Sequence, residues 1–185
     1  LDDIDAIAIQ LKRLEDAGVP ILWRPLHEAS GGWFWWGDAK SDSFKKLWIM
    51  MYERLTMEHQ INNLIWVWNG QNHEWYPGDE YVDIIGEDLY PGERVYNSQS
   101  YKFNEAVKYT DKNKIIAMTE NSCLFDPDLA IRDGACWAWF STWSGEFVVN
   151  PVNGRLSEQY TESEMVNKVY HHENVITLDK LPDFK

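Results

Sequence analysis

Two glutamates in the sequence each follow directly on a largely apolar stretch. Glu28 follows residues 20–27, and Glu120 follows residues 114–119. Hydrolysis of a glycosidic bond needs such a pair of carboxyl groups, because one protonates the leaving oxygen while the other attacks the anomeric carbon or activates water. A single glutamate at the end of a strand is more often a solvated cap or a salt-bridge partner. The prediction of catalysis therefore rests on the pair and on the aromatic residues around it.

Tryptophan is unusually frequent, with 11 among 185 residues. Three of these tryptophans follow a Gly-Gly pair in a loop, namely Trp33, Trp35 and Trp36. We expect at least one of them to contact a sugar, because a flat indole covers the apolar face of a sugar ring at low conformational cost. Three others lie in apolar runs and are expected in the core: Trp48, Trp66 and Trp137. Trp75 and Tyr76 fit equally well with lining a cleft and with packing a turn.

Charge and hydropathy exclude several classes of protein. The formal net charge is −13, and no basic stripe is present, so we expect no nucleic-acid partner. No apolar run approaches the roughly 18–20 residues of a membrane span, so we expect no membrane insertion. A hydrophobic fraction of 44% and an aromatic fraction of 15% are too high for a disordered chain.

Metal and cofactor chemistry find little support. His27 and Glu28 are neighbours, and neighbours in a strand point to opposite faces, so we expect no metal site there and no cofactor. Cys123 and Cys136 lack the CxxC spacing of a zinc site. Two reduced thiols are the favoured interpretation of these cysteines, and one disulfide remains the alternative.

Apolar runs alternate with helical patterns along the chain. The helical patterns cover 2–17, 44–59, 100–112, 127–133 and 162–171, and the strand-like runs cover 20–27, 63–69, 82–88, 114–120 and 135–142. The tail 173–185 has no clear pattern. Strands that are apolar on both faces and alternate with helices predict an α/β fold with a parallel sheet.

Two α/β architectures fit this order, namely an open doubly wound sheet and part of a (β/α)8 barrel. The glycine-rich phosphate-binding motifs GxGxxG and GxxxxGK[ST] are both missing, so a nucleotide-binding sheet loses its main support. A barrel carries its chemistry at the carboxyl ends of the strands. Glu28 and Glu120 stand at such ends, which favours the barrel.

An ordered set of motifs resembles the family 26 glycoside hydrolases, chiefly endo-β-1,4-mannanases. The set comprises Trp23-Arg24-Pro25-Leu26-His27-Glu28, residues 32–37, residues 63–68, residues 76–79, residues 82–86, residues 88–90, Thr119-Glu120-Asn121 and residues 139–143. The similarity runs from about residue 19 to residue 148. It implies a (β/α)8 TIM barrel of which this chain covers approximately strands four to eight, with residues 1–185 forming the C-terminal part of a single catalytic domain.

The resemblance also implies a retaining double displacement, with Glu28 as the acid/base and Glu120 as the nucleophile. The two carboxyl groups are then expected about 5–5.5 Å apart. The residues that the resemblance implies for substrate binding and site support are Arg24, His27, Trp33, Phe34, Asp83, Asp88, Tyr90 and Trp143. Among these, the Tyr90 hydroxyl would bond the nucleophile, Arg24 would orient it or neighbouring carboxylates, and Trp33 and Trp143 would be sugar platforms. Ser122 departs from the pattern, because a glycine is expected there.

The expected partner is a β-mannan-type polysaccharide or oligosaccharide. The first three strands of the barrel have no counterpart here, and the chain opens inside a helical pattern, so we expect a piece of a longer protein. Its partners would then include the N-terminal half of the barrel and, as a further option, attached carbohydrate-binding modules. The resemblance implies a secreted protein.

Three other functions remain open on the sequence alone. Enzymes of the same family acting on mixed-linkage β-1,3-1,4-glucan or on β-1,3-xylan share these motifs. A non-catalytic carbohydrate-binding protein would use the tryptophans without needing both glutamates. A barrel fragment with a purely structural role would need neither feature.

Overall fold

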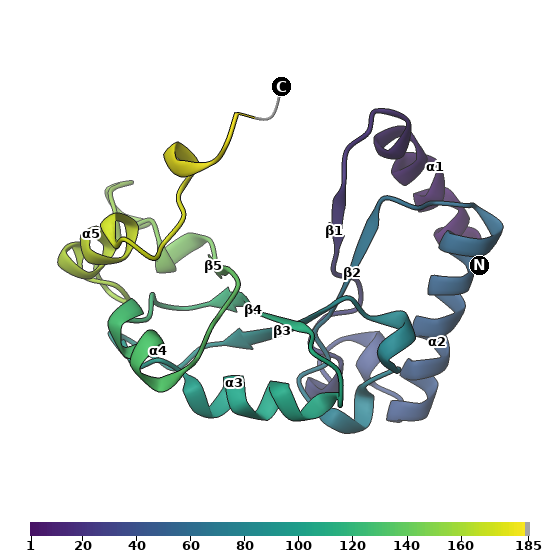
Figure 1. Cartoon of the computed structure of the whole chain (residues 1–185), viewed down its shortest axis with the longest axis horizontal. Coiled ribbons are helices and arrows are strands. Elements are labelled where there is room, and N and C mark those ends of the chain that lie inside the picture. Colours follow the sequence, from purple (N-terminus) through teal and green to yellow (C-terminus); the bar gives the residue numbers. More distant parts are fainter. Residues whose placement is uncertain (184–185) are drawn as a thin grey trace. The chain divides into compact units, whose positions relative to one another are not determined.

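The computed structural model describes residues 1–183, which divide into two compact units. The first unit comprises Leu1–Glu87 and Ala106–Ala117, and the second comprises Asp88–Glu105 and the chain from Met118 onward. Helices and strands follow one another along the chain, with only 3₁₀ turns between β2 and β3, as Figure 1 shows. The strands form a five-stranded sheet in the order β1-β2-β3-β4-β5, and the registers of β1 with β2, β2 with β3 and β4 with β5 are parallel. The predicted α/β fold class is therefore confirmed.

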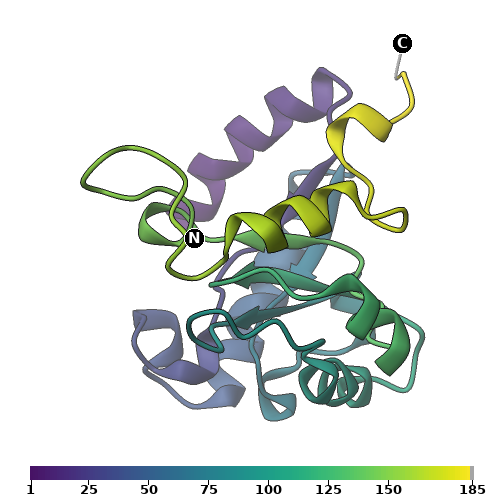
Figure 2. The same cartoon turned by 90° about the vertical axis from the view of Figure 1, so that its left-hand side faces the viewer.

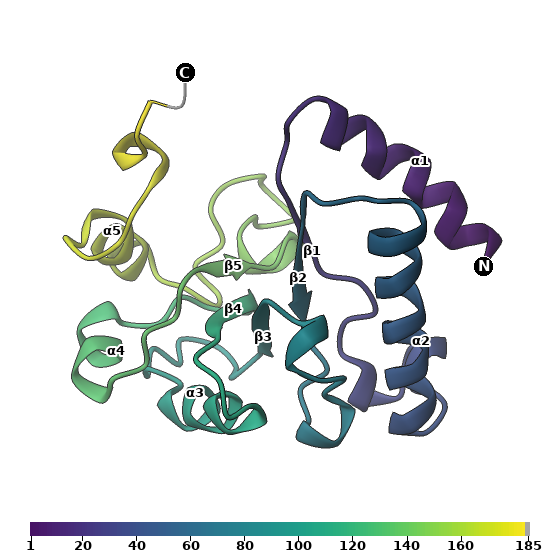
Figure 3. The same ribbon diagram turned by 45° about the vertical axis from the view of Figure 1, so that its right-hand side comes forward.

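The first unit begins with two helices and two strands. These are α1 (Asp2–Asp16), β1 (Ile21–Trp23), α2 (Ser41–Glu53) and β2 (Leu64–Trp68), followed by the start of β3 (Ile84–Leu89). Both helices lie on the same side of β1 and β2 (Figures 1 and 3). Helix α2 buries Phe44, Trp48 and Met51, so its apolar side supplies the core of this unit. The core position predicted for Trp48 is confirmed, and Trp66 on β2 is also buried.

Charge and backbone geometry set the ends of α1. Asp2, Asp3 and Asp5 stand in its first turn, where they complement the positive end of the helix dipole. Gly18 follows the helix with a φ of 70°, a left-handed conformation that glycine adopts without strain. The Arg54 guanidinium, directly after α2, donates to both carboxylate oxygens of Asp5 at 2.6 and 2.7 Å. This ion pair links α1 to the C-terminal end of α2.

The second unit contains most of the remaining elements. They are α3 (Ser100–Ala106), β4 (Ile115–Asn121), α4 (Pro127–Asp133), β5 (Phe140–Thr142) and α5 (Ser163–His171), with the first residues of β4 and the last of α3 in the first unit. A cluster of buried side chains forms the core of this unit: Leu89, Met118, Phe125 and Ala130. Trp137 and Phe140 pack against this cluster and are only partly buried. Trp137 therefore packs against the core, but it is less buried than Trp48.

Two predicted strands are longer than the strands that form. The run 20–27 pairs only over Ile21–Trp23, because Leu26 and Glu28 adopt left-handed backbone conformations that no strand accommodates. The run 135–142 pairs only over Phe140–Thr142, because Ala135 still bonds to the last turn of α4. The helix predicted over 44–59 continues beyond α2 as a wider π turn, Arg54–Glu58.

Short 3₁₀ turns connect the larger elements. They cover Ala29–Gly31, Trp35–Gly37, His73–Trp75, Asp79–Tyr81, Val107–Tyr109, Gly145–Phe147 and Leu178–Lys180. The last of these lies in the tail for which the sequence gives no pattern. After Phe147 the chain makes an open loop (Figure 2). Val149 and Leu156 form an isolated antiparallel bridge across it. Among residues 1–183, no helix is long and apolar enough to cross a membrane.

Candidate active site

Glu28 stands five residues after β1, at the start of the turn Ala29–Gly31. Its side chain is half-buried, and its φ of 53° places it in the left-handed region. A non-glycine residue keeps that conformation only where the surroundings impose it. Its backbone N–H donates to the carbonyl oxygen of Asn69 at 2.7 Å. Asn69 directly follows β2, so the neighbouring strand fixes the position of Glu28.

An aromatic cluster forms on the segment around Glu28. The rings of Phe34 and Trp36 stack with centroids 4.4 Å apart, and the His27 ring lies 4.9 Å from Phe34. The Trp36 indole N–H donates to the His27 carbonyl at 2.8 Å. Trp33 donates its indole N–H to Glu28 Oε2 at 3.1 Å while 63% of its surface stays exposed. Trp33, the predicted sugar platform, is thus an exposed indole that is hydrogen-bonded to the predicted acid/base.

The loop that carries these rings fits closely against the Glu28 turn. Ala29 is fully buried, and a side-chain carbon on Gly37 would lie 2.1 Å from the Ala29 carbonyl oxygen. Only glycine permits this approach. The contact explains why a loop rich in tryptophan also needs glycine.

Arg24 and His27, the other residues predicted on this segment, also lie close to the turn. The Arg24 guanidinium donates from Nη1 to Asn69 Oδ1 at 2.9 Å. Arg24, His27, Trp33 and Phe34 are therefore brought together with Glu28 by the end of β1 and the loop that follows.

Glu120 lies in the second unit, near the carboxyl end of β4. It is buried, with 5% of its surface exposed. The hydroxyl of Tyr90, which follows β3, donates to Glu120 Oε2 at 2.7 Å. A hydroxyl that donates to a carboxylate stabilises its charge and fixes the direction in which the carboxylate points.

Asp88 is held one residue before the end of β3. The hydroxyl of Thr119 donates to Asp88 Oδ1 at 2.6 Å, and both residues are buried. Trp143 follows β5, where its backbone N–H bonds the carbonyl of Asn121 and 47% of its surface is exposed. Asp88, Tyr90, Glu120 and Trp143 therefore stand at the carboxyl ends of their strands. Ser122, the departure from the expected glycine, is buried and donates its N–H to the Leu89 carbonyl.

Asp83 lies elsewhere. It precedes β3 and so stands at the amino end of the sheet, whereas Glu28 follows the carboxyl end of β1. Its carboxylate accepts from the backbone N–H of Trp66 at 2.8 Å, and its own N–H donates to the Trp66 carbonyl. Asp83 thus joins the start of β3 to β2. This placement argues against the substrate-binding role that the resemblance implies for it.

Trp75 and Tyr76 serve packing. The Trp75 ring lies 5.4 Å from Phe44, and the Tyr76 ring meets Trp68 edge-on at 5.1 Å. Burial, and then the hydrogen bond to Asp79, raise the pKa of the Tyr76 hydroxyl well above its ordinary value. Of the two interpretations that the sequence left open, these contacts favour the packed turn.

Sequence reasoning gave no role in the site to three of the described residues that contact it. Asn69 bonds both Arg24 and Glu28, and Thr119 bonds Asp88. Phe147 lies edge-on to Tyr90, with ring centroids 5.6 Å apart. Asn69 and Thr119 each stand at a strand end, so the rule that selected Glu28 and Glu120 would have found them. Nothing in the sequence indicates the contact of Phe147.

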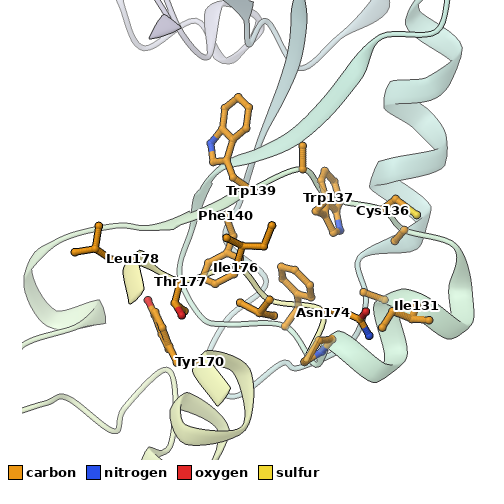
Figure 4. Close-up of a pocket in the computed structure, with 16 residues that line it drawn as sticks. Ile131, Cys136, Trp137, Trp139, Phe140, Tyr170, Asn174, Ile176, Thr177 and Leu178 are labelled. Carbon is orange, nitrogen blue, oxygen red and sulfur yellow. The ribbon is translucent and has the colours of Figure 1, made fainter. Parts of the chain in front are cut away.

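A separate apolar pocket of about 570 Å³ lies in the second unit. Figure 4 shows that Trp137, Trp139 and Phe140 line it from the segment that leads into β5, and Ile176 and Leu178 from the C-terminal tail. Of the predicted site residues, none lines this pocket. Cys136 at its rim is exposed, Cys123 is buried, and both are free thiols.

Comparison with known proteins identifies the family. The model of glycosyl hydrolase family 26 matches residues 1–180. A mannan endo-1,4-beta-mannosidase of Thermothelomyces thermophilus is 44% identical over 181 residues, which cover 98% of this chain and 36% of that protein. Mannan endo-1,4-beta-mannosidase B of a Piromyces species is 36% identical over the whole of this chain and 30% of its own length.

Two solved structures are similar in fold. The GH26-CBM35 β-(1,4)-mannanase of Podospora anserina superposes with a TM-score of 0.87 at 43% identity, over 98% of this chain and 39% of that one. A β-mannanase from a symbiotic protist of the termite Reticulitermes speratus, solved with a gluco-manno-oligosaccharide, also reaches a TM-score of 0.87, at 40% identity over 98% of this chain and 54% of that one.

These matches confirm that the fold is part of the barrel predicted from the sequence motifs. The chain spans about a third of the length of the two curated relatives. The family model covers nearly every residue of the chain, in both units. The chain therefore belongs to glycosyl hydrolase family 26.

Proposed function

We propose that the protein containing this chain is a retaining endo-β-1,4-mannanase. The observation that carries the proposal is the buried carboxylate of Glu120 at the end of β4, held by the Tyr90 hydroxyl at 2.7 Å. A nucleophilic carboxylate needs a fixed direction of approach to the anomeric carbon, and this donor supplies it. Glu28, at the end of β1 with an indole N–H on Oε2, takes the role of acid/base.

The proposed reaction proceeds in two displacements. In the first, a Glu120 oxygen bonds to the anomeric carbon, the glycosidic C–O bond breaks, and the proton of Glu28 passes to the leaving oxygen. In the second, Glu28 takes a proton from water as the water oxygen bonds to the anomeric carbon, and the bond to Glu120 breaks. Two inversions at the same carbon retain its configuration.

Mannan, glucomannan and galactomannan are the proposed substrates. The similar proteins support this choice by their names, and one of them was solved with a gluco-manno-oligosaccharide. Trp33 and Trp143 expose enough indole surface to receive sugar rings at two places in the chain. Cleavage of mixed-linkage glucan or β-1,3-xylan without cleavage of mannan would replace mannan as the proposed substrate by another polysaccharide on which the family acts.

The proposal includes the surroundings of the chain. The Thermothelomyces thermophilus and Podospora anserina relatives are more than twice as long as this chain, and the description of the second names a CBM35 module. We propose that this chain likewise works within a longer catalytic domain. Secretion belongs to the proposal as well, since polymeric mannan is too large to enter a cell.

Hydrolysis assays on the full-length protein test the proposal. Reducing-sugar release from mannan, glucomannan and barley β-glucan is measured for the wild type, Glu28→Ala and Glu120→Ala. Glu164→Ala, on the surface of α5, is the matched control. We expect the control to equal the wild type and each active-site variant to lose at least about 10³-fold in kcat on mannan. Wild-type turnover by Glu120→Ala would remove the assignment of the nucleophile.

The stereochemical part has its own test. A crystal structure of the full-length protein should place the carboxyl groups of Glu28 and Glu120 about 5–5.5 Å apart. A separation near 9 Å would leave room for a water molecule and would indicate inversion.

A further inference from the structure

Asn69 is a buried polar residue that joins β2 to β3 and to the segment after β1 in the first unit. Only 1% of its surface is exposed. Its Oδ1 accepts from Arg24 Nη1 at 2.9 Å, and its Nδ2 donates to the Gly86 carbonyl at 3.1 Å. Its own carbonyl accepts the N–H of Glu28 at 2.7 Å. The residue thus contacts the chain after β1 and the middle of β3 from its place at the end of β2.

These bonds constrain the backbone that carries Glu28. The left-handed φ of Glu28 is unfavourable for a residue with a side chain, so neighbouring groups must hold it. The Glu28 N–H is held by Asn69, and the preceding carbonyl, that of His27, is held by the Trp36 indole. The peptide unit before Glu28 is therefore bonded at both of its polar atoms.

The side chain of Asn69 determines where its carbonyl lies. Arg24 and Gly86 bond the two ends of its amide, so the residue cannot rotate without breaking a buried hydrogen bond. A buried amide that satisfies groups on both sides acts as a rigid link between the strands. Loss of the amide would release the Asn69 backbone and, with it, the anchor of Glu28.

We propose that Asn69 is a positioning residue that sets the location of the Glu28 carboxyl group for proton transfer. The proposal rests on the function proposed above, in which Glu28 is the acid/base. Asn69 does not touch the reacting atoms. It acts on the proton-transfer steps, whereas the Tyr90 hydroxyl holds the nucleophile Glu120.

Leaving-group chemistry separates this role from a general loss of structure. A sugar leaving group must be protonated as it departs, so its cleavage depends on the acid. A dinitrophenolate leaves without a proton, so kcat/KM for a dinitrophenyl β-mannobioside does not depend on the acid. Removal of Asn69 should therefore lower kcat/KM for the oligosaccharide and leave kcat/KM for the aryl glycoside nearly unchanged.

The experiment compares Asn69→Ala with Asn63→Ala in the full-length protein. Asn63 is the matched control, because it stands at the amino end of the same strand and donates to the Val19 carbonyl. We expect Asn69→Ala to lower kcat/KM for mannotetraose about 10- to 100-fold and for the aryl glycoside less than about threefold. Asn63→Ala should change both values by the same small factor.

A second readout follows the base step. Azide attacks the glycosyl-enzyme without needing a base, so added azide should raise kcat of Asn69→Ala on the aryl glycoside and yield the mannobiosyl azide. The wild type should show no such increase. Equal losses on the two substrates, or wild-type values on both, would overturn the positioning role.

Asn69→Asp covers the case in which the alanine variant does not fold. The aspartate keeps an acceptor for Arg24 and lacks the donor for the Gly86 carbonyl, so the same selective loss is expected at a smaller size. A uniform loss in this variant would equally contradict the inference. If the wild type cleaves neither substrate, the proposed function itself fails, which is a result separate from every outcome for the variants.

Discussion

Tyr90 is the residue whose single hydrogen bond bears most directly on the proposed chemistry. Its hydroxyl donates to Glu120 at 2.7 Å, and its ring is supported edge-on by Phe147. A hydrogen bond to a charged group contributes roughly 1.5–3 kcal/mol. The contact is therefore large enough to govern the direction of the nucleophile.

Replacing Tyr90 by phenylalanine keeps the ring and removes the donor. We expect kcat on mannan oligosaccharides to fall about 10- to 100-fold, because 1.36 kcal/mol corresponds to a factor of about ten in rate. Steady-state kinetics on the full-length protein measure this fall. Tyr101→Phe, on the exposed side of α3, is the matched control and should leave kcat unchanged. A Tyr90→Phe enzyme as fast as the control would show that the hydroxyl does not serve the reaction.

Among the structural elements, Asp83 affects the joining of β2 to β3. Its carboxylate bonds the Trp66 N–H and so joins β2 to the start of β3. Replacing Asp83 by alanine should lower the free energy of unfolding by about 1 kcal/mol. The same variant should keep kcat/KM within about twofold of the wild type.

Urea unfolding and mannan hydrolysis, measured on the same preparation of Asp83→Ala, separate the two roles. Asp88→Ala provides the comparison, since Asp88 stands at the carboxyl end of the same strand. A large loss of activity in Asp83→Ala at unchanged stability would restore the substrate-binding role that the resemblance implies.

The attachment of α1 should depend on pH. Hydrogen bonds from Arg54 and then His59 hold the pKa of the Asp5 carboxyl well below its ordinary value. A carboxyl with a lowered folded-state pKa contributes stability above its unfolded pKa, near 4, and loses that contribution as the pH falls through the folded-state value. The difference in unfolding free energy between wild type and Asp5→Asn should therefore be greatest at about pH 7 and shrink below about pH 4.

Urea unfolding of both proteins across that pH range measures the difference. Asp3→Asn is the matched control, because it removes a charge from the same first turn of α1. A difference for Asp5→Asn that stays constant down to about pH 2 would contradict this origin of the stability.

Some helices and strands could be predicted from the sequence, and others could not. Apolar periodicity located α1, α4, α5 and the strands β2 to β4, because an element buried on one or both faces carries apolar residues at regular spacing. It overextended β1 and β5, because apolar residues that fill the space beside a strand look like strand residues. The left-handed conformations of Leu26 and Glu28 have no pattern in the sequence, since tertiary hydrogen bonds impose them.

The site residues could likewise be predicted only where the sequence carries a pattern. The strand-end rule placed Glu28 and Glu120, and it would also have selected Asn69 had polar neutral residues been considered. Asp83 came from the resemblance alone and precedes its strand, which is why the structure places it at the opposite end of the sheet. A position that satisfies both the motif and the strand-end rule is the better predictor of function.

At the scale of the whole molecule, the chain contains only part of a barrel, and this leaves its sheet with two edge strands. The strands β1 and β5 stand first and last in the sheet order, and Leu22 on β1 exposes 54% of its surface. A strand without a neighbour on one side exposes backbone groups that pair with other chains. The rest of the barrel, under the proposal, covers these edges.

Residues 1–185 expressed alone should therefore aggregate or unfold without cooperativity. Light scattering after size-exclusion chromatography and a urea titration measure both properties, with the full-length protein as the comparison. A monomer that unfolds in one sharp transition would show that these residues form a self-sufficient domain and would contradict the proposed dependence on the missing strands.

Covalent trapping tests the central claim most directly. A dinitrophenyl mannobioside with fluorine in place of the hydroxyl beside the anomeric carbon slows both displacements, and its good leaving group restores only the first, so the glycosyl-enzyme accumulates. Peptide mass spectrometry of the full-length protein should then find the fluoromannobiosyl group on Glu120. A label on another residue, or turnover that yields the inverted anomer without any label, would contradict the account.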